Sequence, residues 1–508
     1  MKPYPAITEN LIDKAIRFVA PVAAQKRMAA RIRLGMYDAF SGASDKPALK
    51  SWRASRGDAD SDINSALSVL RPRSRDLARN TLLGRGIIRT CRDNVVGSGL
   101  YLDARIDRDV LGMSDAEAEK WEANTEREFE LFADSTECDI ERCLNFYGLQ
   151  ELAFTSALIN GESFGVLTHI KDRNSPYKLV VNLIEADRCS NPDNKFDTEQ
   201  LTSGIEKDEN GAPVKYHFSS FHPGSLRYFA QKKEWYEVPA YNSLGLRNVI
   251  HLFEKERVGQ TRGIPYLTPV IEALRQLEQY TNAELMAAVI SGMYTVFLKD
   301  EDYDDIDDLE NPDGKKEDAV SETKMSAGTM VHLGKGKTIE NPIPGRPNSG
   351  FDPFFNAIVK QIGASLGVPF EIMLKIFQSS YSASQAAMHE AWRFFKHRRM
   401  WLATYFIQPI YERWLWEAVA LGRISAPGFF ADPLRRKAYL GAEWVGPAKG
   451  MIDEMKQINA AKTRIETGIT TLKEETINLT GGDYKKNLRQ RGEELKQMEQ
   501  YGLRGGEI

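Results

Sequence analysis

Apolar residues recur at three- and four-residue steps over several long stretches of the chain, which predicts amphipathic helices. Residues 114–134 form one such stretch, with Ser114 as the N-cap and Glu117 as its capping-box partner. Residues 145–163 form another. Several short runs rich in Val, Ile, Tyr and Phe follow, bounded by turn residues, and these predict strands. The sequence therefore predicts a helix-rich α+β domain over residues 61–264.

The pattern changes at Pro265, where a long helix over residues 265–293 is predicted. Pro265 and Pro269 lie in its first turns, where proline is best tolerated. A second helix is predicted over 350–372, and residues 294–349 between the two form a small insert with strands and a Pro- and Gly-rich return loop. This arrangement predicts a stalk of two helices that carries a cap.

A short Ser-rich loop, residues 373–383, precedes the longest predicted helix, residues 384–424. Pro409 is expected to kink that helix. Its aromatic residues pack either one core or, in addition, a neighbouring subunit, and the residues leave both interpretations open. The residues expected to carry this packing are Trp392, Phe395, Trp401 and Phe406. A basic cluster on the same helix either faces solvent or contacts phosphate: Arg393, Lys396, His397, Arg398 and Arg399.

Charge is unevenly distributed along the chain, although the net charge is only −4. Residues 1–100 contain 18 Lys or Arg against 9 Asp or Glu, and residues 1–60 predict a basic amphipathic helix with a polar linker. Residues 300–318 contain 11 acidic residues against two lysines. The basic region suggests nucleic acid or acidic partners, and the acidic segment suggests a solvated docking face. Both together favour an assembly component over a small-molecule enzyme.

The composition is that of an ordinary globular protein, with 508 residues of which 42% are hydrophobic and 27% charged. No apolar run approaches the roughly 18 residues that a membrane span needs. Asp13, Lys14 and Arg17 interrupt the N-terminal segment, so no signal peptide is expected. These features predict a cytosolic product without a membrane span.

No catalytic, metal or cofactor motif emerges from the sequence. Cys138 and Cys143 lack the close spacing of a zinc site. The segment HLGKGKT, residues 332–338, ends like a P-loop, but Val331 stands where that motif needs glycine, and prolines follow instead of a helix. The acidic segment lacks the glycine and glutamate spacing of an EF-hand. We therefore expect no enzymatic activity of this chain's own and no cofactor.

Four segments in order resemble the portal proteins of tailed phages, specifically the lambda-type portal family. They are residues 73–100, 262–288, 380–424 and 441–475. The resemblance extends from about residue 65 to about residue 503. It implies a ring-forming subunit, expected to be dodecameric, at the capsid vertex through which DNA is packaged and ejected.

The resemblance also implies the parts of a portal subunit. After a basic arm (1–60), these are a wing (61–264), two stem helices (265–293 and 350–372), a clip (294–349), a tunnel loop (373–383), a long wing helix (384–424) and a crown (425–508). The clip would dock the terminase large subunit and later head-completion or adaptor proteins. Its expected docking residues are Asp302, Asp304, Asp305, Asp307 and Asp308.

The tunnel loop would contact double-stranded DNA without reading its sequence. Its expected contact residues are Lys375, Gln378, Ser379, Ser380 and Tyr381. A ring repeats each side chain around one channel, so inward-facing cations would hold the duplex through many phosphate contacts. Gln378, Ser379 and Ser380 carry no charge and offer weak, exchangeable hydrogen bonds, which suits a duplex that must slide, and Lys375 at the base of the loop would add a modest attraction.

The resemblance also implies that the chain binds further copies of itself and the major capsid or scaffold protein. The expected location is the virion, with the host cytoplasm during assembly. Two alternatives remain at this point. One is a nucleic-acid motor enzyme, which the missing P-loop disfavours. The other is a membrane-active or injected virion protein that acts through the basic N-terminal helix.

Overall fold

The structure, a computed structural model, describes residues 16, 18–23, 25–27, 51, 54–226, 232–292, 297–300, 337–340, 348–376, 380–450 and 453–502. Internal contacts divide the chain into two compact units, residues 1–62 and residues 63–508. In the first unit, the described residues between 16 and 27 are largely helical, with Phe18 and Val19 exposed. A helix in this segment agrees with the basic amphipathic pattern.

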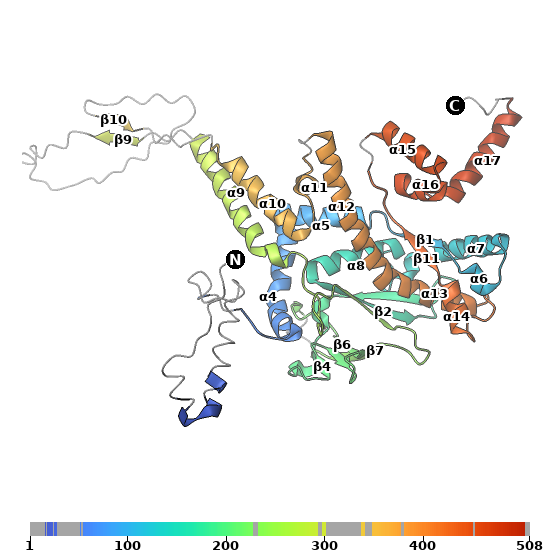
Figure 1. The fold of residues 1–508 in the computed structure, drawn as a ribbon, viewed down its shortest axis with the longest axis horizontal. Helices are drawn as coiled ribbons and strands as arrows, with labels where there is room; N and C mark the ends of the chain where they lie inside the picture. The colour runs from blue at the N-terminus through green and yellow to red at the C-terminus, as the bar shows by residue number, and fades with distance from the viewer. Residues whose placement is uncertain are drawn as a thin grey trace, which may run out of the picture. The chain divides into compact units, whose positions relative to one another are not determined.

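Residues 63–508 form the helix-rich α+β unit that the sequence predicts (Figure 1). Two antiparallel sheets lie in its first half. One has three strands in the order β3 (Leu179–Ile184), β2 (Glu162–His169), β8 (Val249–Phe253). The other has four, in the order β4 (Leu201–Thr202), β5 (Ile205–Lys207), β6 (Pro213–Ser219), β7 (Trp235–Pro239). All of these strands fall in the region predicted to be mixed.

Two further antiparallel pairs join segments that are distant in sequence. Strand β1 (Tyr101–Ala104) pairs with β11 (Ala442–Val445), so the C-terminal part of the chain returns to the first. Strand β9 (Phe297–Asp300) pairs with β10 (Lys337–Glu340) within the predicted insert.

The helices before the stalk begin at residues whose side chains satisfy free backbone N–H groups. They are α4 (Ala59–Asn80), α5 (Leu82–Val95), α6 (Arg108–Leu111), α7 (Asp115–Ala133) and α8 (Phe146–Asn160). The predicted capping box of α7, formed by Ser114 and Glu117, is present. Asn145 caps α8, and α8 lies along β2 (Figure 1).

The predicted stalk helices differ from the expected ranges at their ends. A 3₁₀ turn (Thr268–Val270) precedes α9 (Ile271–Gly292), because the prolines in this segment donate no backbone hydrogen bond. The second helix divides into α10 (Phe351–Leu366) and α11 (Phe370–Leu374). Gly367 separates them in a left-handed conformation (φ +71°), and a Cβ there would lie 3.3 Å from Phe394. Glycine fits this turn without that crowding.

The long helix continues through its predicted kink. Helix α12 (Tyr381–Leu402) passes into a π-helical turn (Ala403–Ile407) and then into α13 (Gln408–Ala420). Within that turn, the N–H of Gln408 bonds to the carbonyl of Ala403, five residues earlier. Pro409 has no N–H to donate, so the distortion falls in the turn before it.

The main core surrounds α13. Trp414 and Tyr411 of this helix are fully buried, and they pack with Phe129 from α7. Phe395 and Phe406 are buried in the same core, whereas Trp392 and Trp401 are half-buried against it. A second, smaller core lies around Phe164, Tyr216 and Phe218, between the two sheets.

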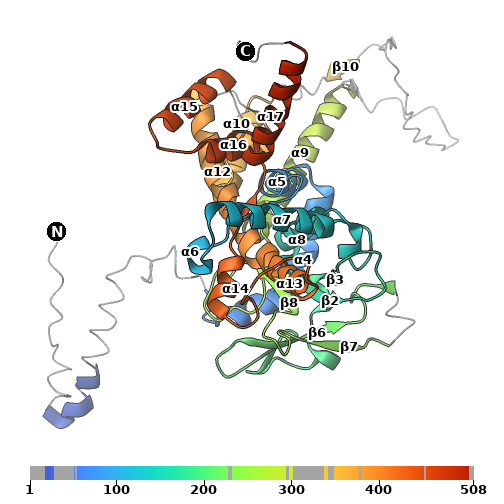
Figure 2. The same cartoon turned by 90° about the vertical axis from the view of Figure 1, so that its right-hand side faces the viewer.

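Among the described residues of the C-terminal part, four helices follow the long one. They are α14 (Pro433–Tyr439), α15 (Glu454–Glu466), α16 (Leu472–Thr480) and α17 (Tyr484–Gln500). Figures 1 and 2 show α15, α16 and α17 grouped together after β11. This helical, charged ending agrees with the sequence prediction for residues 425–508.

Candidate functional site

The Ser-rich loop lies between two well-anchored helix ends. Lys375 ends α11 in a left-handed conformation (φ 56°) and is exposed. Ser380 begins α12, where its Oγ accepts a hydrogen bond from the N–H of Ala383 at 3.4 Å. Sequence analysis predicted only a DNA contact for Ser380, and the structure shows that this residue also caps α12. Gln378, Ser379 and the side chain of Tyr381 lie outside the described residues.

The turn before the loop is held by close backbone packing. The N–H of Val368 bonds to the carbonyl of Gly363 at 3.0 Å, and a Cβ on Gly363 would lie 2.6 Å from the carbonyl oxygen of Val368. Ile372 and Met373 of α11 are buried in the main core, where α11 contacts α5 and α12. The start of the loop is therefore fixed by packing on the α11 side.

The basic cluster of α12 divides into residues with different roles. Arg398 forms an ion pair with Glu254, and its guanidinium lies 5.3 Å from the ring of Tyr266. Arg399 donates to the carbonyls of Asn94 and Val95 at the end of α5, and to that of Pro447. Burial lowers the pKa of Arg399 to about 10. We interpret these two arginines as structural, because both contact groups of the same subunit.

Arg399 thus satisfies carbonyls that helix α5 leaves without helical partners. A cation at a helix C-terminus is also favoured by the helix dipole. Its third bond reaches the segment after β11, so one side chain ties α5, α12 and the approach to the C-terminal helices together.

A buried ionic cluster fixes the point at which the chain enters the stalk. Glu162, at the start of β2, is fully buried and accepts from Arg262, Arg71 and His251. It also accepts from the N–H of Gly263 at 3.0 Å. Burial alone would raise the pKa of Glu162, but Arg262 and Arg71 hold it well below its usual range. The carboxylate therefore stays ionised.

We call Glu162, Arg71, Arg262 and His251 the stalk-base cluster. Arg262 also donates to the carbonyls of Ala186, Cys189 and Ser203, which fixes its position further. Because these residues come from α4, β2, β8 and the segment that leads into α9, the cluster joins the α+β region to the stalk helices.

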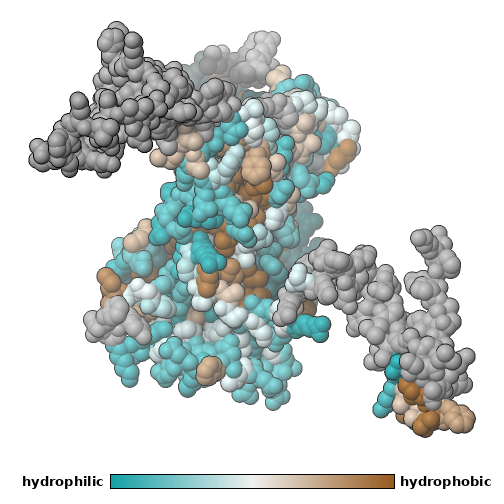
Figure 3. Space-filling view, turned by 90° about the vertical axis from the view of Figure 1, so that its left-hand side faces the viewer, coloured by the Kyte–Doolittle hydropathy of each residue, from teal (hydrophilic) through white to brown (hydrophobic). Residues whose placement is uncertain are grey.

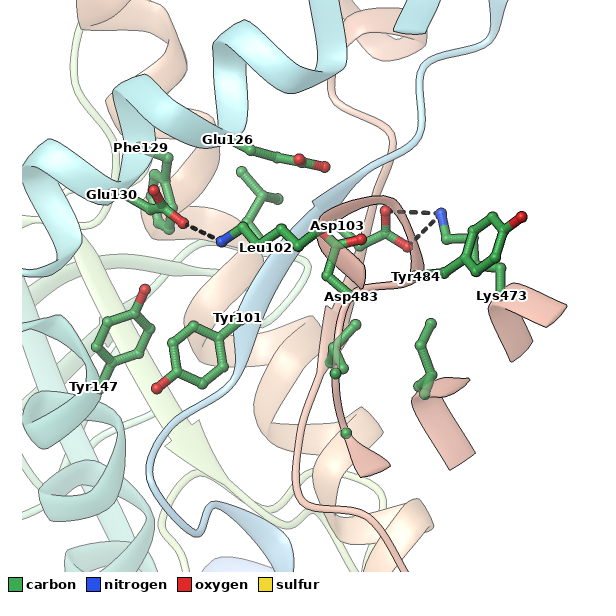
Figure 4. Close-up of a pocket in the computed structure, with 15 residues that line it drawn as sticks. Tyr101, Leu102, Asp103, Glu126, Phe129, Glu130, Tyr147, Lys473, Asp483 and Tyr484 are labelled. Carbon is green, nitrogen blue, oxygen red and sulfur yellow. Dashed lines mark hydrogen bonds and ion pairs between the residues drawn. The ribbon is translucent and has the colours of Figure 1, made fainter. Parts of the chain in front are cut away.

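The C-terminal helices are attached to the main body by lysines that meet carboxylates (Figure 4). Lys473 lies 2.8 Å from Asp103 on β1, and Lys486 lies 2.9 Å from Glu130 on α7. Lys485 lies 3.5 Å from Glu122. The first two pairs, Lys473 with Asp103 and Lys486 with Glu130, line a cavity of about 200 Å³, which Tyr101 and Glu126 also line. The attachment in this area is largely ionic.

Glu126 has an unusual environment beside this cavity. Burial raises its pKa to about 7, and the neighbouring charges of Asp103 and Asp483 add to the effect. Its carboxylate accepts from the N–H of Ala104 at 3.0 Å. Because the folded protein binds this proton more tightly than the unfolded chain does, stability decreases as pH rises from about 4.3 to about 7.

Glu126→Gln should therefore raise the melting temperature at pH 8 by a few degrees and leave it unchanged at pH 4. Glutamine resembles the protonated carboxyl and keeps an oxygen for the N–H of Ala104. Melting curves across this pH range provide the measurement. Glu130→Gln, which changes an exposed partner of Lys486, is the control and should bring no gain at pH 8. An equal gain in the control would contradict the assignment to Glu126.

With this geometry established, comparison with known proteins identifies the family. The profile of the family described as phage portal protein, lambda family, matches residues 45–399. The chain belongs to this family. It is 26% identical to portal protein B of Escherichia phage lambda over 477 residues, covering 90% of this chain and 89% of the relative. It is 25% identical to the portal protein of Escherichia phage N15, with the same coverage.

Solved structures also show a distant likeness. A chain from the neck of an empty gene transfer agent (GTA) particle is 11% identical, with a TM-score of 0.42, and covers 82% of this chain and 94% of its own length. A chain from a native GTA virion is 12% identical, with a TM-score of 0.40, and covers 80% of this chain and 93% of its own length. The family assignment rests on the sequence comparisons alone.

For this phage portal protein, the described residues include no helix that is long and apolar enough to cross a membrane. The clip aspartates Asp302, Asp304, Asp305, Asp307 and Asp308 lie outside the described residues. Their docking role therefore stays a prediction.

The sequence missed two clusters of potential metal ligands in the described part of the portal subunit. They are Glu185, Asp187 and His222, and Glu206, His217 and Glu237. Arg75 lies 3.2 Å from Glu185 in the first, and Lys215 lies 3.1 Å from Glu237 in the second. In each cluster a basic side chain of the protein thus contacts at least one of the carboxylates. Cys138 and Cys143 belong to neither.

Proposed function

We propose that this chain forms the portal ring of a tailed phage, with a structural and not an enzymatic role. Membership of the lambda portal family carries the proposal. In this proposal, twelve copies surround a channel for double-stranded DNA, and a partner ATPase, the terminase large subunit, supplies the energy. The ring would assemble in the host cytoplasm with capsid or scaffold protein and would remain at the vertex of the virion.

The parts of the subunit are assigned in the same proposal. Helices α9 and α10 form the stem, residues 294–349 form the clip that docks terminase and later adaptor proteins, and the C-terminal helices form the crown. The segment from Lys375 to Tyr381 faces the DNA. The exposed position of Lys375 and Ser380, between anchored helices, supports this last assignment.

Apolar side chains exposed on the stem support assembly with further copies. Leu285 and Met286 of α9 are 62% and 58% exposed, and Phe354 of α10 is 52% exposed. Figure 3 shows hydrophobic side chains at the surface among hydrophilic ones on the side of the molecule that carries α9 and α10 in Figure 1. Such surfaces mark interaction sites, and a ring buries the same surface on every subunit.

Leu285→Asp combined with Met286→Asp should shift the protein from rings toward monomers at low concentration. Each apolar side chain buried between subunits contributes about 1.5–3 kcal/mol, and aspartate loses that contribution. Light scattering after chromatography measures the assembly, and circular dichroism checks that the subunit folds. Asn282→Asp, on an exposed position of the same helix, is the control. Unchanged assembly of the double variant would exclude this surface from the ring contact.

A further inference from the structure

A cleft of about 570 Å³ lies between α12 and the C-terminal helices α15 and α16. One wall is a stripe of α12 at helical spacing, formed by Gln385, His389, Trp392 and Lys396. The opposite wall includes Lys449, from the segment before α15, and Arg464 of α15. Figures 1 and 2 show these helices beside α12.

Positive charge in this cleft exceeds negative charge. The carboxylate of Glu475 is occupied by Arg464 through two bonds of 2.8 and 2.7 Å, and Asp453 lies 3.0 Å from Lys456. In contrast, Lys396 has no ion-pair or hydrogen-bond partner among the described residues, and Lys449 has no carboxylate partner among them. Two cations of the cleft are therefore not balanced by an acid.

The side chain of Lys449 is held in position by a neutral partner. Its Nζ donates to Nδ1 of His389 at 2.8 Å. Burial and the charge of Lys449 lower the pKa of His389, so the imidazole accepts this bond in its neutral form. Burial and the charge of Lys396 lower the pKa of Lys449 in turn. An anion between the two lysines would relieve this repulsion.

We propose that this cleft binds the backbone phosphates of double-stranded DNA through Lys396 and Lys449. The inference rests on the proposed portal function and adds a second DNA contact to the loop. Mostly polar and charged side chains line the cleft, as phosphate binding requires, whereas the centre of a protein interface is depleted of charge. The stripe also starts at Gln385, about one turn after Ser380 at the end of the loop.

The test compares rings of the Lys396→Gln, Lys449→Gln double variant with wild-type rings. Binding of a short DNA duplex of arbitrary sequence is measured by fluorescence anisotropy over a range of salt concentrations. Each lysine that contacts phosphate contributes about 0.9 to the slope of log affinity against log salt. The variant should bind more weakly, and its slope should fall by about two for each subunit that engages the duplex. The double variant Lys396→Arg, Lys449→Arg keeps both positive charges, so it should retain the wild-type DNA affinity and the wild-type slope.

A matched control removes two lysines of the C-terminal helices outside the cleft, through Lys462→Gln and Lys496→Gln. This control should leave affinity and slope close to wild type. Equal loss in the control, or unchanged binding by the cleft variant, would overturn the proposal. So would specific competition by inorganic phosphate at matched ionic strength, because it would assign the cleft to the free anion.

Ring formation separates this inference from the portal function. If the cleft variant forms no rings while wild type does, the cleft binds a neighbouring subunit instead of DNA, and the proposal is wrong. If wild-type protein itself forms no rings, the proposed function fails instead. If the cleft variant forms intact rings that bind DNA more weakly, the result supports both the DNA-binding cleft and the portal function.

Discussion

Glu162→Gln should destabilise the subunit by about 3–5 kcal/mol, because removing one partner of a buried ion pair leaves the other charges uncompensated. In this variant Arg71 and Arg262 would remain buried without their carboxylate. Denaturant unfolding followed by circular dichroism gives the free energy directly. Because the stalk-base cluster joins β2 to the entry of α9, the surviving folded protein should also assemble poorly.

Glu119→Gln provides the control for this prediction. Glu119 is 61% exposed and lies 3.6 Å from Lys485, so its loss should change stability by no more than about 1 kcal/mol. A similar small change for Glu162→Gln would show that the stalk-base cluster is not a main source of stability.

The same cluster predicts a response to acid. The pKa of Glu162 in the folded protein lies well below its value in the unfolded chain, so its stabilisation is present above about pH 4.3 and is lost as pH falls toward the folded-state pKa. Glu162→Gln should remove this part of the acid sensitivity.

Ser379→Arg should leave ring assembly intact and impair the passage of DNA. In a ring the substitution repeats in every subunit, and each phosphate contact adds about 0.9 to the salt dependence of DNA binding. A duplex held in this way would slide less readily, so a packaging assay should show less DNA taken up. Normal packaging by Ser379→Arg rings would remove the proposed role of the loop.

Ser380 needs a separate variant, because its hydroxyl caps α12. Ser380→Ala should lower stability by about 0.5–2 kcal/mol without adding charge. Ser380→Asp keeps a capping oxygen and adds a negative charge that repels phosphate. Together these variants separate the loss of the helix cap from the effect on DNA. Replacing both Ser379 and Ser380 with arginine would change the cap and the DNA contact at once.

Local patterns in the sequence predicted much of the fold. The capping box of α7 is readable from Ser114 and Glu117 alone, because both partners lie within one turn. The distortion near Pro409 follows from its missing N–H. Helix ends were less predictable, since the break at Gly367 depends on the approach of Phe394 from a distant helix.

Contacts between distant segments could not be predicted in this way. Glu162 and Arg262 are 100 residues apart, and no periodic pattern connects them. The pairing of β1 with β11 and the bonds of Arg399 to the end of α5 likewise depend on the whole fold. The basic cluster of α12 is an example: the same run of basic residues includes Arg399, which is bonded within the subunit, and Lys396, which has no partner in the part of the chain that the structure describes.

Native mass spectrometry of the purified protein, with negative-stain electron microscopy of the same sample, tests the central claim most directly. The portal account predicts closed rings with a central hole and a mass of about twelve subunits, consistent with the closed symmetry of homo-oligomers. Stable monomers at all concentrations, both alone and with capsid protein present, would contradict it.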